Sequence, residues 1–206
     1  MSMADQTAPT VFVVDDDDDL RGALCQLLEA AGMAVEGYAD GAAFLASYHE
    51  ERPGCLVLDV AMGDMSGLEV QQALTERGLE IPTLFLTGHG DIPMAVTAVQ
   101  AGATNFLEKP VDGAVLLEQV NQALELDREH RARQAGIHAI QQRRASLSPR
   151  ELEVMALVVA GLSSKDIGRK LGLSHRTVEV HRTHIMHKMG AQNLAELVRL
   201  AAAADI

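Results

Sequence analysis

Short apolar runs alternate with amphipathic segments along the first half of the chain. The runs have the length and β-branched content of strands that are buried on both faces of a sheet. They lie at Thr10 to Val14, Ala34 to Tyr38, Cys55 to Asp59, Thr83 to Thr87 and Asn105 to Glu108. Segments with helical spacing lie near Leu20 to Ala31, Gly41 to Ser47, Ser66 to Arg77 and Ile92 to Ala101, and a fifth begins at Asp112. This alternation predicts an α/β domain with a parallel sheet.

The apolar pattern fades after the fifth helix begins. Leu116, Val120 and Leu124 share one helical face, whereas charged and glutamine-rich residues follow them. We therefore expect one domain over residues 1–124 and a helical, solvated linker over residues 125–145, because a structureless loop of that length is unusual in a compact protein. A dimeric coiled coil is an alternative for this segment, although sustained heptads are missing.

The remaining residues, 146–206, carry start and stop signals for short helices. Ser148, Pro149 and Glu151 supply an N-cap, a proline at the first helical position and a capping-box acid. Further helix ends and starts are marked at Gly161, Ser163 or Ser164, Gly172, Ser174, Gly190 and Asn193. The two middle helices meet at a tight turn, so this segment is predicted to be an all-α helix-turn-helix domain.

Charge differs sharply between the two parts of the chain. The chain has 206 residues and a formal net charge of -12. Through Leu124, 4 bases and 20 acids give a net of -16, and from Glu125 onward 13 bases and 9 acids give +4. An acidic chain argues against nucleic acid as a partner, but the basic C-terminal part retains an electrostatic footprint for phosphates.

The sequence shows no sign of export or membrane insertion. The N-terminus lacks the pattern of a signal peptide, and the longest apolar stretch, Val154 to Leu162, is too short to cross a bilayer. We expect a cytoplasmic protein without a membrane partner. Cys25 and Cys55 lack the spacing of a metal or redox site and are expected to be buried thiols.

Carboxylates collect at the ends of two predicted strands. Asp15 to Asp19 follow the first strand directly, and Asp59 ends the third. Ligands of parallel sheets lie beyond the carboxyl ends of the strands, and clustered carboxylates repel one another unless a hard cation neutralises them. The cluster therefore predicts a Mg²⁺ site, with Asp17 to Asp19 better explained as the start of a helix.

Two further strand ends bring groups suited to phosphate. Thr87 closes the fourth strand and Lys109 closes the fifth. A hydroxyl, an ammonium and a metal around one carboxylate suit a transferring phosphoryl group. Asp59 stands alone at the end of the central strand, so it is the candidate nucleophile and would form an aspartyl phosphate.

Residues 10 to 124 resemble the receiver domain of bacterial two-component response regulators. The resemblance is carried by Val13-Val14-Asp15-Asp16, Leu58-Asp59, Met62 with Ser66-Gly67, Leu86-Thr87-Gly88 and Phe106-Leu107-Glu108-Lys109-Pro110. It implies a flavodoxin-like (βα)5 fold in which Asp59 accepts phosphate from a sensor histidine kinase. It also implies that Asp16, Asp59 and the Ala61 carbonyl bind Mg²⁺, and that Asp15 lies behind them or binds the ion through water.

The same resemblance gives roles to residues of the last two strands. Thr87 and Lys109 would hold the phosphoryl oxygens, and Phe106 matches the aromatic switch position of the family. The bond between Lys109 and Pro110 is expected to be cis.

The loop after Asp59 departs from the family pattern. The family commonly has proline after the methionine, whereas this chain has Gly63 followed by Asp64. The glycine should loosen the loop and the acid adds charge near the pocket, which leaves metal affinity and phosphate lifetime open.

Leu147 to Ala203 resembles the LuxR-class DNA-binding domain of NarL- and FixJ-type regulators. The matching residues are Leu147-Ser148-Pro149-Arg150-Glu151, Gly161 to Ile167 and Thr177-Val178-Glu179-Val180-His181-Arg182, with Ile185, Lys188 and Met189. The stretch from Thr87 to Met94 further suggests the FixJ branch.

The expected recognition helix, Ser174 to Met189, has two different faces. Val178, His181, Ile185 and Met189 recur at helical spacing and should be core. The opposite face should enter the major groove, where Arg can pair with guanine, Glu with cytosine and Val or Thr methyl groups with thymine, while flanking bases suit phosphates. The expected DNA-binding set is Lys165, Arg176, Thr177, Glu179, Val180, Arg182, Thr183, His187 and Lys188. For Glu179 a solvated helix face is nearly as good an explanation.

Three other interpretations fit parts of the sequence less well. A phosphohydrolase of the haloacid dehalogenase type has a second Asp two residues after the nucleophile, where this chain has Ala61. A calcium-binding loop could open at Asp15, but it lacks the glycine and the closing glutamate of such loops. A metal site of His181, His184 and His187 lacks a common helical face.

We expect instead a transcription regulator that is not an enzyme. Phosphorylation would promote formation of a homodimer and binding to a roughly palindromic site on double-stranded DNA. The histidine kinase supplies the phosphate in this scheme, and RNA polymerase is a further expected partner.

Overall fold

The computed structural model describes residues 8–88 and 105–203. The chain divides into two compact units, residues 1–130 and 131–206. Within the described ranges, no helix combines the length and the apolar character needed to span a membrane. The helix predicted near Ile92 to Ala101 lies outside the described residues, as does most of the stretch that suggests the FixJ branch.

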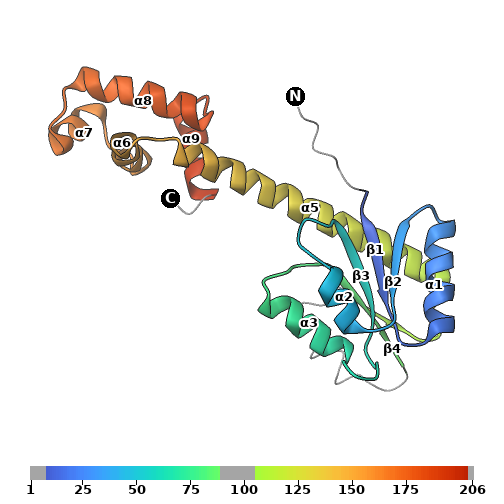
Figure 1. Cartoon of the computed structure of the whole chain (residues 1–206). Helices are drawn as coiled ribbons and strands as arrows, with labels where there is room; N and C mark the ends of the chain where they lie inside the picture. The colour runs from blue at the N-terminus through green and yellow to red at the C-terminus, as the bar shows by residue number, and fades with distance from the viewer. Residues whose placement is uncertain (1–7, 89–104, 204–206) are drawn as a thin grey trace. The chain divides into compact units, whose positions relative to one another are not determined.

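The N-terminal unit is built on a parallel five-stranded sheet (Figure 1). Its strands are β1 (Thr10–Val14), β2 (Ala34–Tyr38), β3 (Gly54–Asp59), β4 (Thr83–Thr87) and β5 (Asn105–Glu108). They pair in the order β2-β1-β3-β4-β5, and every pair is parallel. The predicted α/β fold is therefore confirmed, with the flavodoxin-like strand order and with β3 in the middle of the sheet.

Helices cover both faces of this sheet. They are α1 (Asp18–Ala30), α2 (Gly41–Ser47), α3 (Gly67–Glu76) and α5 (Gly113–Ala145). The side chains of a strand alternate between faces, so Phe12 and Val14 of β1 pack with α2 and α3, while Val11 and Val13 pack with α1 and the first part of α5 (Figure 1). All four are fully buried. The strands are continuous apolar runs because both faces are covered.

The two cysteines differ in burial, and both are free thiols. Cys55 on β3 is fully buried, and this burial raises the pKa of its thiol to about 12. Cys25 on α1 is only half-buried. The prediction of buried thiols is confirmed for Cys55 and only partly met by Cys25.

Helix α5 extends through the segment that was predicted to be a solvated linker. Asp127, near the start of the predicted linker, departs from that prediction, because it is only 3 % exposed. Its carboxylate accepts a hydrogen bond of 2.9 Å from the backbone N–H of Gly54, the first residue of β3. A single acid in a run of charged residues looks solvated in sequence, so the pattern gave no signal for this contact.

The C-terminal unit contains a series of short helices. They are α6 (Pro149–Val159), α7 (Ser164–Leu171), α8 (His175–Met189) and α9 (Leu194–Ala203). The predicted N-caps Ser148, Ser163 and Ser174 each accept a hydrogen bond from the backbone N–H three residues further on. Gly172 and Gly190 are left-handed at the ends of α7 and α8. These start and stop signals are confirmed.

Helices α7 and α8 meet at the predicted tight turn. The backbone N–H of Leu173 donates to the carbonyl of Gly168 at 2.9 Å. A Cβ added to Gly168 would lie 2.7 Å from the carbonyl oxygen of Leu173, so only glycine lets the turn pass this close to α7. The turn places α8 as the second helix of a helix-turn-helix.

An ion pair between a buried glutamate and an exposed lysine joins α6 to α8. Glu151 is 4 % exposed, and its Oε2 lies 2.7 Å from Nζ of Lys188. The same oxygen accepts a hydrogen bond of 2.8 Å from the backbone N–H of Ser148, which completes the predicted capping box. The bonds from Lys188 and Ser148 lower the pKa of Glu151 to about 2, so this carboxylate is ionised at neutral pH.

Candidate functional site

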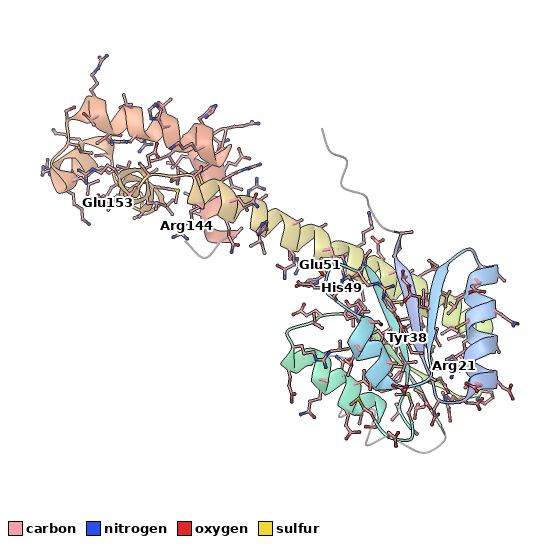
Figure 2. All side chains as sticks on the ribbon, in the orientation of Figure 1. Arg21, Tyr38, His49, Glu51, Arg144 and Glu153 are labelled. Carbon is pink, nitrogen blue, oxygen red and sulfur yellow. The ribbon has the colours of Figure 1, made fainter. Side chains whose placement is uncertain are left out.

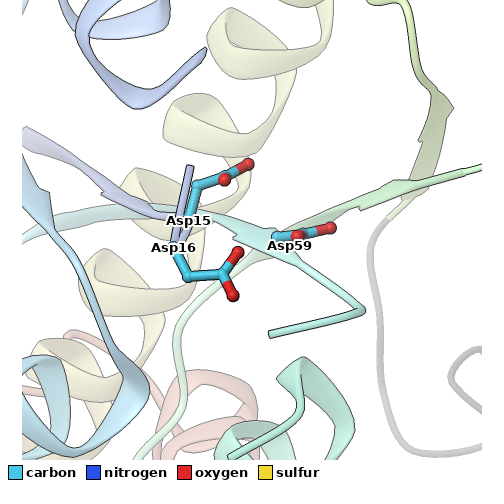
Figure 3. Close-up of side chains that lie close together, drawn as sticks. All are labelled: Asp15, Asp16 and Asp59. Atoms are coloured by element: carbon cyan, nitrogen blue, oxygen red, sulfur yellow. The ribbon is translucent and has the colours of Figure 1, made fainter. Parts of the chain in front are cut away.

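Three aspartates meet at the carboxyl edge of the sheet (Figure 3). Asp15 and Asp16 follow β1, and Asp59 ends the neighbouring strand β3. One carboxylate oxygen of each residue lies within 4.8 Å of the other two. Asp15 is fully buried and Asp59 nearly so, whereas Asp16 is exposed. The structure therefore assembles the predicted cluster and leaves one carboxylate open to solvent.

Lys109 enters the cluster from the end of β5. Its Nζ lies 2.9 Å from Oδ2 of Asp15 and 3.0 Å from Oδ1 of Asp59. Its backbone N–H donates to the Thr87 carbonyl at 2.8 Å, and its peptide bond to Pro110 is cis, as predicted. One ammonium thus bridges carboxylates that come from two different strands.

Burial and charge act in opposite directions in this pocket. Burial raises the pKa of Asp59, against the hydrogen bond and positive charge of Lys109, and the negative charge of Asp15 raises it further. Burial alone would lower the pKa of Lys109, but its bonds to the two carboxylates raise the pKa overall. Lys109 therefore stays charged, and Asp59 is more basic than an ordinary aspartate. Such shifted pKa values are typical of functional sites.

Backbone groups and one side chain hold the residues of the cluster in place. The backbone N–H of Asp17 donates to Oδ1 of Asp15 at 2.9 Å, and that of Gly63 donates to Oδ2 of Asp16 at 3.1 Å. The guanidinium of Arg21, labelled in Figure 2, donates to the backbone carbonyl of Asp15 at 2.7 Å. The sequence gave no signal for the roles of Gly63 and Arg21, because each depends on how the chain folds back on itself.

Gly67 lets the chain pass close behind Asp59. It is the first residue of α3, and a Cβ added to it would lie 2.3 Å from the carbonyl oxygen of Asp59. Its backbone N–H donates to the carbonyl of Val60 at 3.0 Å. Ser66, just before it, forms a capping box with Glu69 at the start of α3. The loop from Asp59 to α3 is therefore tightly held at its far end.

Thr87 and Phe106, predicted to respond to phosphorylation, lie on the paired strands β4 and β5. The hydroxyl of Thr87 donates to the carbonyl of Gly88 at 3.1 Å. Phe106 is half-buried and lies opposite Phe85, and the two rings stack with their centroids 5.3 Å apart. Because Thr87 is also bonded through its carbonyl to Lys109, the two predicted phosphoryl ligands share one stretch of the sheet edge.

The groups in the pocket suit a divalent cation. Three carboxylates and one ammonium sum to a formal charge of -2 when all are ionised, which one Mg²⁺ balances. Oxygen atoms are the ligands that Mg²⁺ prefers, and the exposed side of Asp16 leaves room for the water molecules that this ion keeps. Ala61, the source of the predicted carbonyl ligand, is exposed in the loop that follows Asp59.

Helix α8 has a buried and an exposed face, as the sequence predicted, but His181 departs from the prediction that it is core. Val178, Ile185 and Met189 are buried, whereas His181 is only partly so. The exposed residues of the expected DNA-binding set are Lys165 on α7 and Arg176, Glu179, Val180, Thr183, His187 and Lys188 on α8, while Thr177 and Arg182 are partly buried. Val180 is an apolar side chain with 48 % of its surface exposed. In a major groove such a side chain can contact the methyl group of thymine.

Lys188 differs from the rest of this set. It was predicted to contact phosphates, yet its Nζ is bonded to Glu151 and to the carbonyl of Ser146 at 3.2 Å. Its side chain is 37 % exposed. Its charge therefore has a partner inside the unit, a role that the sequence did not predict.

Comparison with known proteins covers both units. Residues 11–121 match the response regulator receiver domain, and residues 145–201 match the bacterial regulatory proteins of the luxR family. The transcriptional regulatory protein FixJ of Azorhizobium caulinodans is 43% identical over 196 residues, which are 95% of this chain and 93% of FixJ. The response regulator protein TodT of Pseudomonas putida is 39% identical over 193 residues, 94% of this chain and 85% of TodT.

A solved structure gives the same result. The response regulator StyR is 44% identical in sequence and superimposes with a TM-score of 0.87. The match covers 95% of this chain and 99% of the StyR chain.

Proposed function

Because the chain belongs to the response regulators that join a receiver domain to a LuxR-family DNA-binding domain, we propose that Asp59 is the phosphorylated residue through which it is controlled. Proteins of this family are phosphorylation-dependent regulators of transcription. The observation that carries the proposal is the bridge from Lys109 to Asp15 and Asp59 within the carboxylate cluster.

The geometry supports phosphoryl transfer to Asp59 from a histidine kinase. A carboxylate oxygen of Asp59 attacks phosphorus, the P–N bond to the kinase histidine breaks, and the electron pair of that bond leaves with the imidazole. Lys109 already lies 3.0 Å from Oδ1 of Asp59, so its ammonium needs to move little to bind a phosphoryl oxygen. Thr87, at the end of β4, supplies a hydroxyl donor from the same edge of the sheet.

Mg²⁺ completes this proposed site. Asp16, Asp59 and the carbonyl of Ala61 would hold the ion, with Asp15 behind them or binding through water, and the closeness of the carboxylates supports this set. When bound, the ion neutralises charge on the phosphoryl oxygens. Lys109 remains beside Asp15 and holds the positive charge on the buried side of the pocket.

Thr87 and Phe106 are proposed to pass the signal on. When Thr87 turns towards the phosphoryl group, its strand β4 shifts relative to β5, which carries Phe106. The surface formed by β5 and the start of α5 then changes, and the 43 % exposed Val115 lies on that part of α5. A change in such a surface is the proposed cause of homodimer formation.

The exposed face of α8 is proposed to read DNA. Arg176, Glu179, Val180 and Thr183 would face bases, and the remaining residues of the set would approach the backbone. The proposal leaves out Lys188, because its ammonium is paired with Glu151. Two copies in a dimer would then read two half-sites, with RNA polymerase as a further partner.

The test treats the full chain with acetyl phosphate and Mg²⁺ and follows phosphorylation, mass in solution and affinity for promoter fragments. Wild type should gain one phosphoryl group, form a dimer and bind DNA more tightly, and Asp59→Asn should do none of these. Asp64→Asn is the matched control, because Asp64 is an exposed aspartate in the adjoining loop. Equal phosphorylation of Asp59→Asn and wild type would sink the proposal.

A further inference from the structure

Gly63 is the residue that contacts the most exposed carboxylate of the pocket. Its backbone N–H donates to Oδ2 of Asp16 at 3.1 Å. The other two carboxylates are fixed by Lys109, which contacts Asp15 and Asp59. Asp16 therefore takes its support from the loop that follows Asp59.

Neither space nor backbone conformation explains a glycine at this position. A Cβ added to Gly63 would lie 3.9 Å from Oδ2 of Asp16, an ordinary van der Waals distance. The φ angle of Gly63 is not positive, so an L side chain fits its backbone. What Gly63 shares with alanine, but not with proline, is the backbone N–H.

We propose that the backbone N–H of Gly63 is a positioning group for Asp16, which holds one carboxylate oxygen and leaves the other for Mg²⁺. This inference rests on the metal site of the proposed function. The presence of a backbone N–H at position 63 would then raise the affinity of the unphosphorylated pocket for Mg²⁺.

The physical basis is the pre-organisation of a ligand. A carboxylate has two oxygens and about four acceptor sites, so it can accept an N–H and bind a cation together. An exposed aspartate without such a partner samples several rotamers and must be ordered when the ion binds. Hydrogen-bond partners of metal ligands typically change metal affinity by about 10- to 100-fold.

The experiment measures Mg²⁺ binding to the full, unphosphorylated chain by titration calorimetry. Gly63→Pro removes the N–H and should weaken binding by about tenfold or more. Gly63→Ala keeps the N–H and should bind within about twofold of wild type, given the room around this position. This pair of variants separates the donor from the loss of glycine itself.

A second measurement does not depend on a proline in the loop. In isotope-labelled wild type, the amide of Gly63 should exchange slowly for a loop residue, because it is bonded to Asp16. Asp16→Ala should speed that exchange, and Asp64→Ala should leave it slow. Addition of Mg²⁺ to wild type should leave the protection in place.

Different results would overturn different claims. If wild type binds no Mg²⁺, the metal site of the proposed function fails and this inference fails with it. If wild type and Gly63→Pro bind Mg²⁺ equally, or if Asp16→Ala leaves the Gly63 amide unchanged, the inference fails while the metal site stands. If Gly63→Pro is unfolded, the amide measurement alone decides.

Discussion

Replacement of Glu151 by glutamine should destabilise the C-terminal unit at neutral pH but not in acid. Glutamine keeps the shape and the capping-box acceptor, so the variant removes only the charge that faces Lys188. The pKa of Glu151 falls from 4.5 to about 2 on folding. At about 1.4 kcal/mol for each pKa unit this corresponds to roughly 3 kcal/mol. Part of the pKa shift comes from the bonds with Ser148, which glutamine keeps, and the Lys188 side chain is 37 % exposed. We therefore discount the loss to about 2 kcal/mol.

The sign of the pH dependence follows from the lowered pKa. The contribution of Glu151 is fully present above its unfolded pKa of 4.5 and is lost as the pH falls towards its folded value of about 2. The difference between wild type and Glu151→Gln should therefore shrink to less than half of its neutral value near pH 3. Comparison of the two proteins at each pH removes the effect of other acids that titrate in this range.

Hydrogen exchange read by mass spectrometry can measure this loss in the full chain. About 2 kcal/mol corresponds to roughly 30-fold lower protection for amides of α6 and α8 that exchange through unfolding. Peptides of the N-terminal unit serve as an internal control. Glu153→Gln is the matched control, because Glu153 pairs with Arg150 on the surface of the same helix and such pairs contribute little. A loss below about threefold, or an equal loss at pH 3 and pH 7, would refute the reasoning.

Three further predictions concern the pocket, the sheet and the DNA surface. Lys109→Gln should slow phosphorylation by acetyl phosphate by about 10- to 100-fold, since an ammonium beside the phosphoryl group is lost; thermal melting checks that the variant is folded at the assay temperature. Asp127→Ala should destabilise the N-terminal unit by about 1–3 kcal/mol by removing the acceptor of a buried N–H; Asp127→Asn keeps an acceptor and should cost less in thermal unfolding. Lys165→Ala should weaken binding to all DNA sequences alike and lower the slope of log affinity against log salt by about 1. Arg176→Ala should instead reduce the preference for one base pair of the site. If Arg176→Ala weakened binding to every sequence equally, the assignment of Arg176 to a base would be contradicted.

The sheet and the carboxylate cluster could be predicted because their signals are local. Burial on both faces leaves an unbroken apolar run, and the bounds of four strands agree with the prediction, while β3 begins at Gly54, one residue before Cys55. Parallel strands bring their carboxyl ends to one edge. The meeting of Asp15 with Asp59 then follows from the order of the strands.

Other contacts depend on the meeting of segments far apart in sequence. Asp127 is bonded to Gly54 across 73 positions, and Lys188 to Glu151 across 37. In both cases the local pattern is that of a solvated helix face, because one buried charge does not change the periodicity of its helix. The bond between Gly63 and Asp16 is a third case. Every residue except proline has a backbone N–H, so the sequence does not reveal which one donates to a carboxylate.

The geometry behind the pocket restricts which residue can occupy position 67. A Cβ at this position would lie 2.3 Å from the carbonyl oxygen of Asp59. Every substitution of Gly67 would therefore displace the strand end that carries the candidate phosphoacceptor. A glycine retained here in related chains would be retained for steric reasons, although it is not among the residues proposed to bind the ion or the phosphoryl group. A mutational scan that measures only function would therefore not distinguish Gly67 from a residue that binds the ion or the phosphoryl group. Measuring the stability of each variant as well separates a steric role from a binding role.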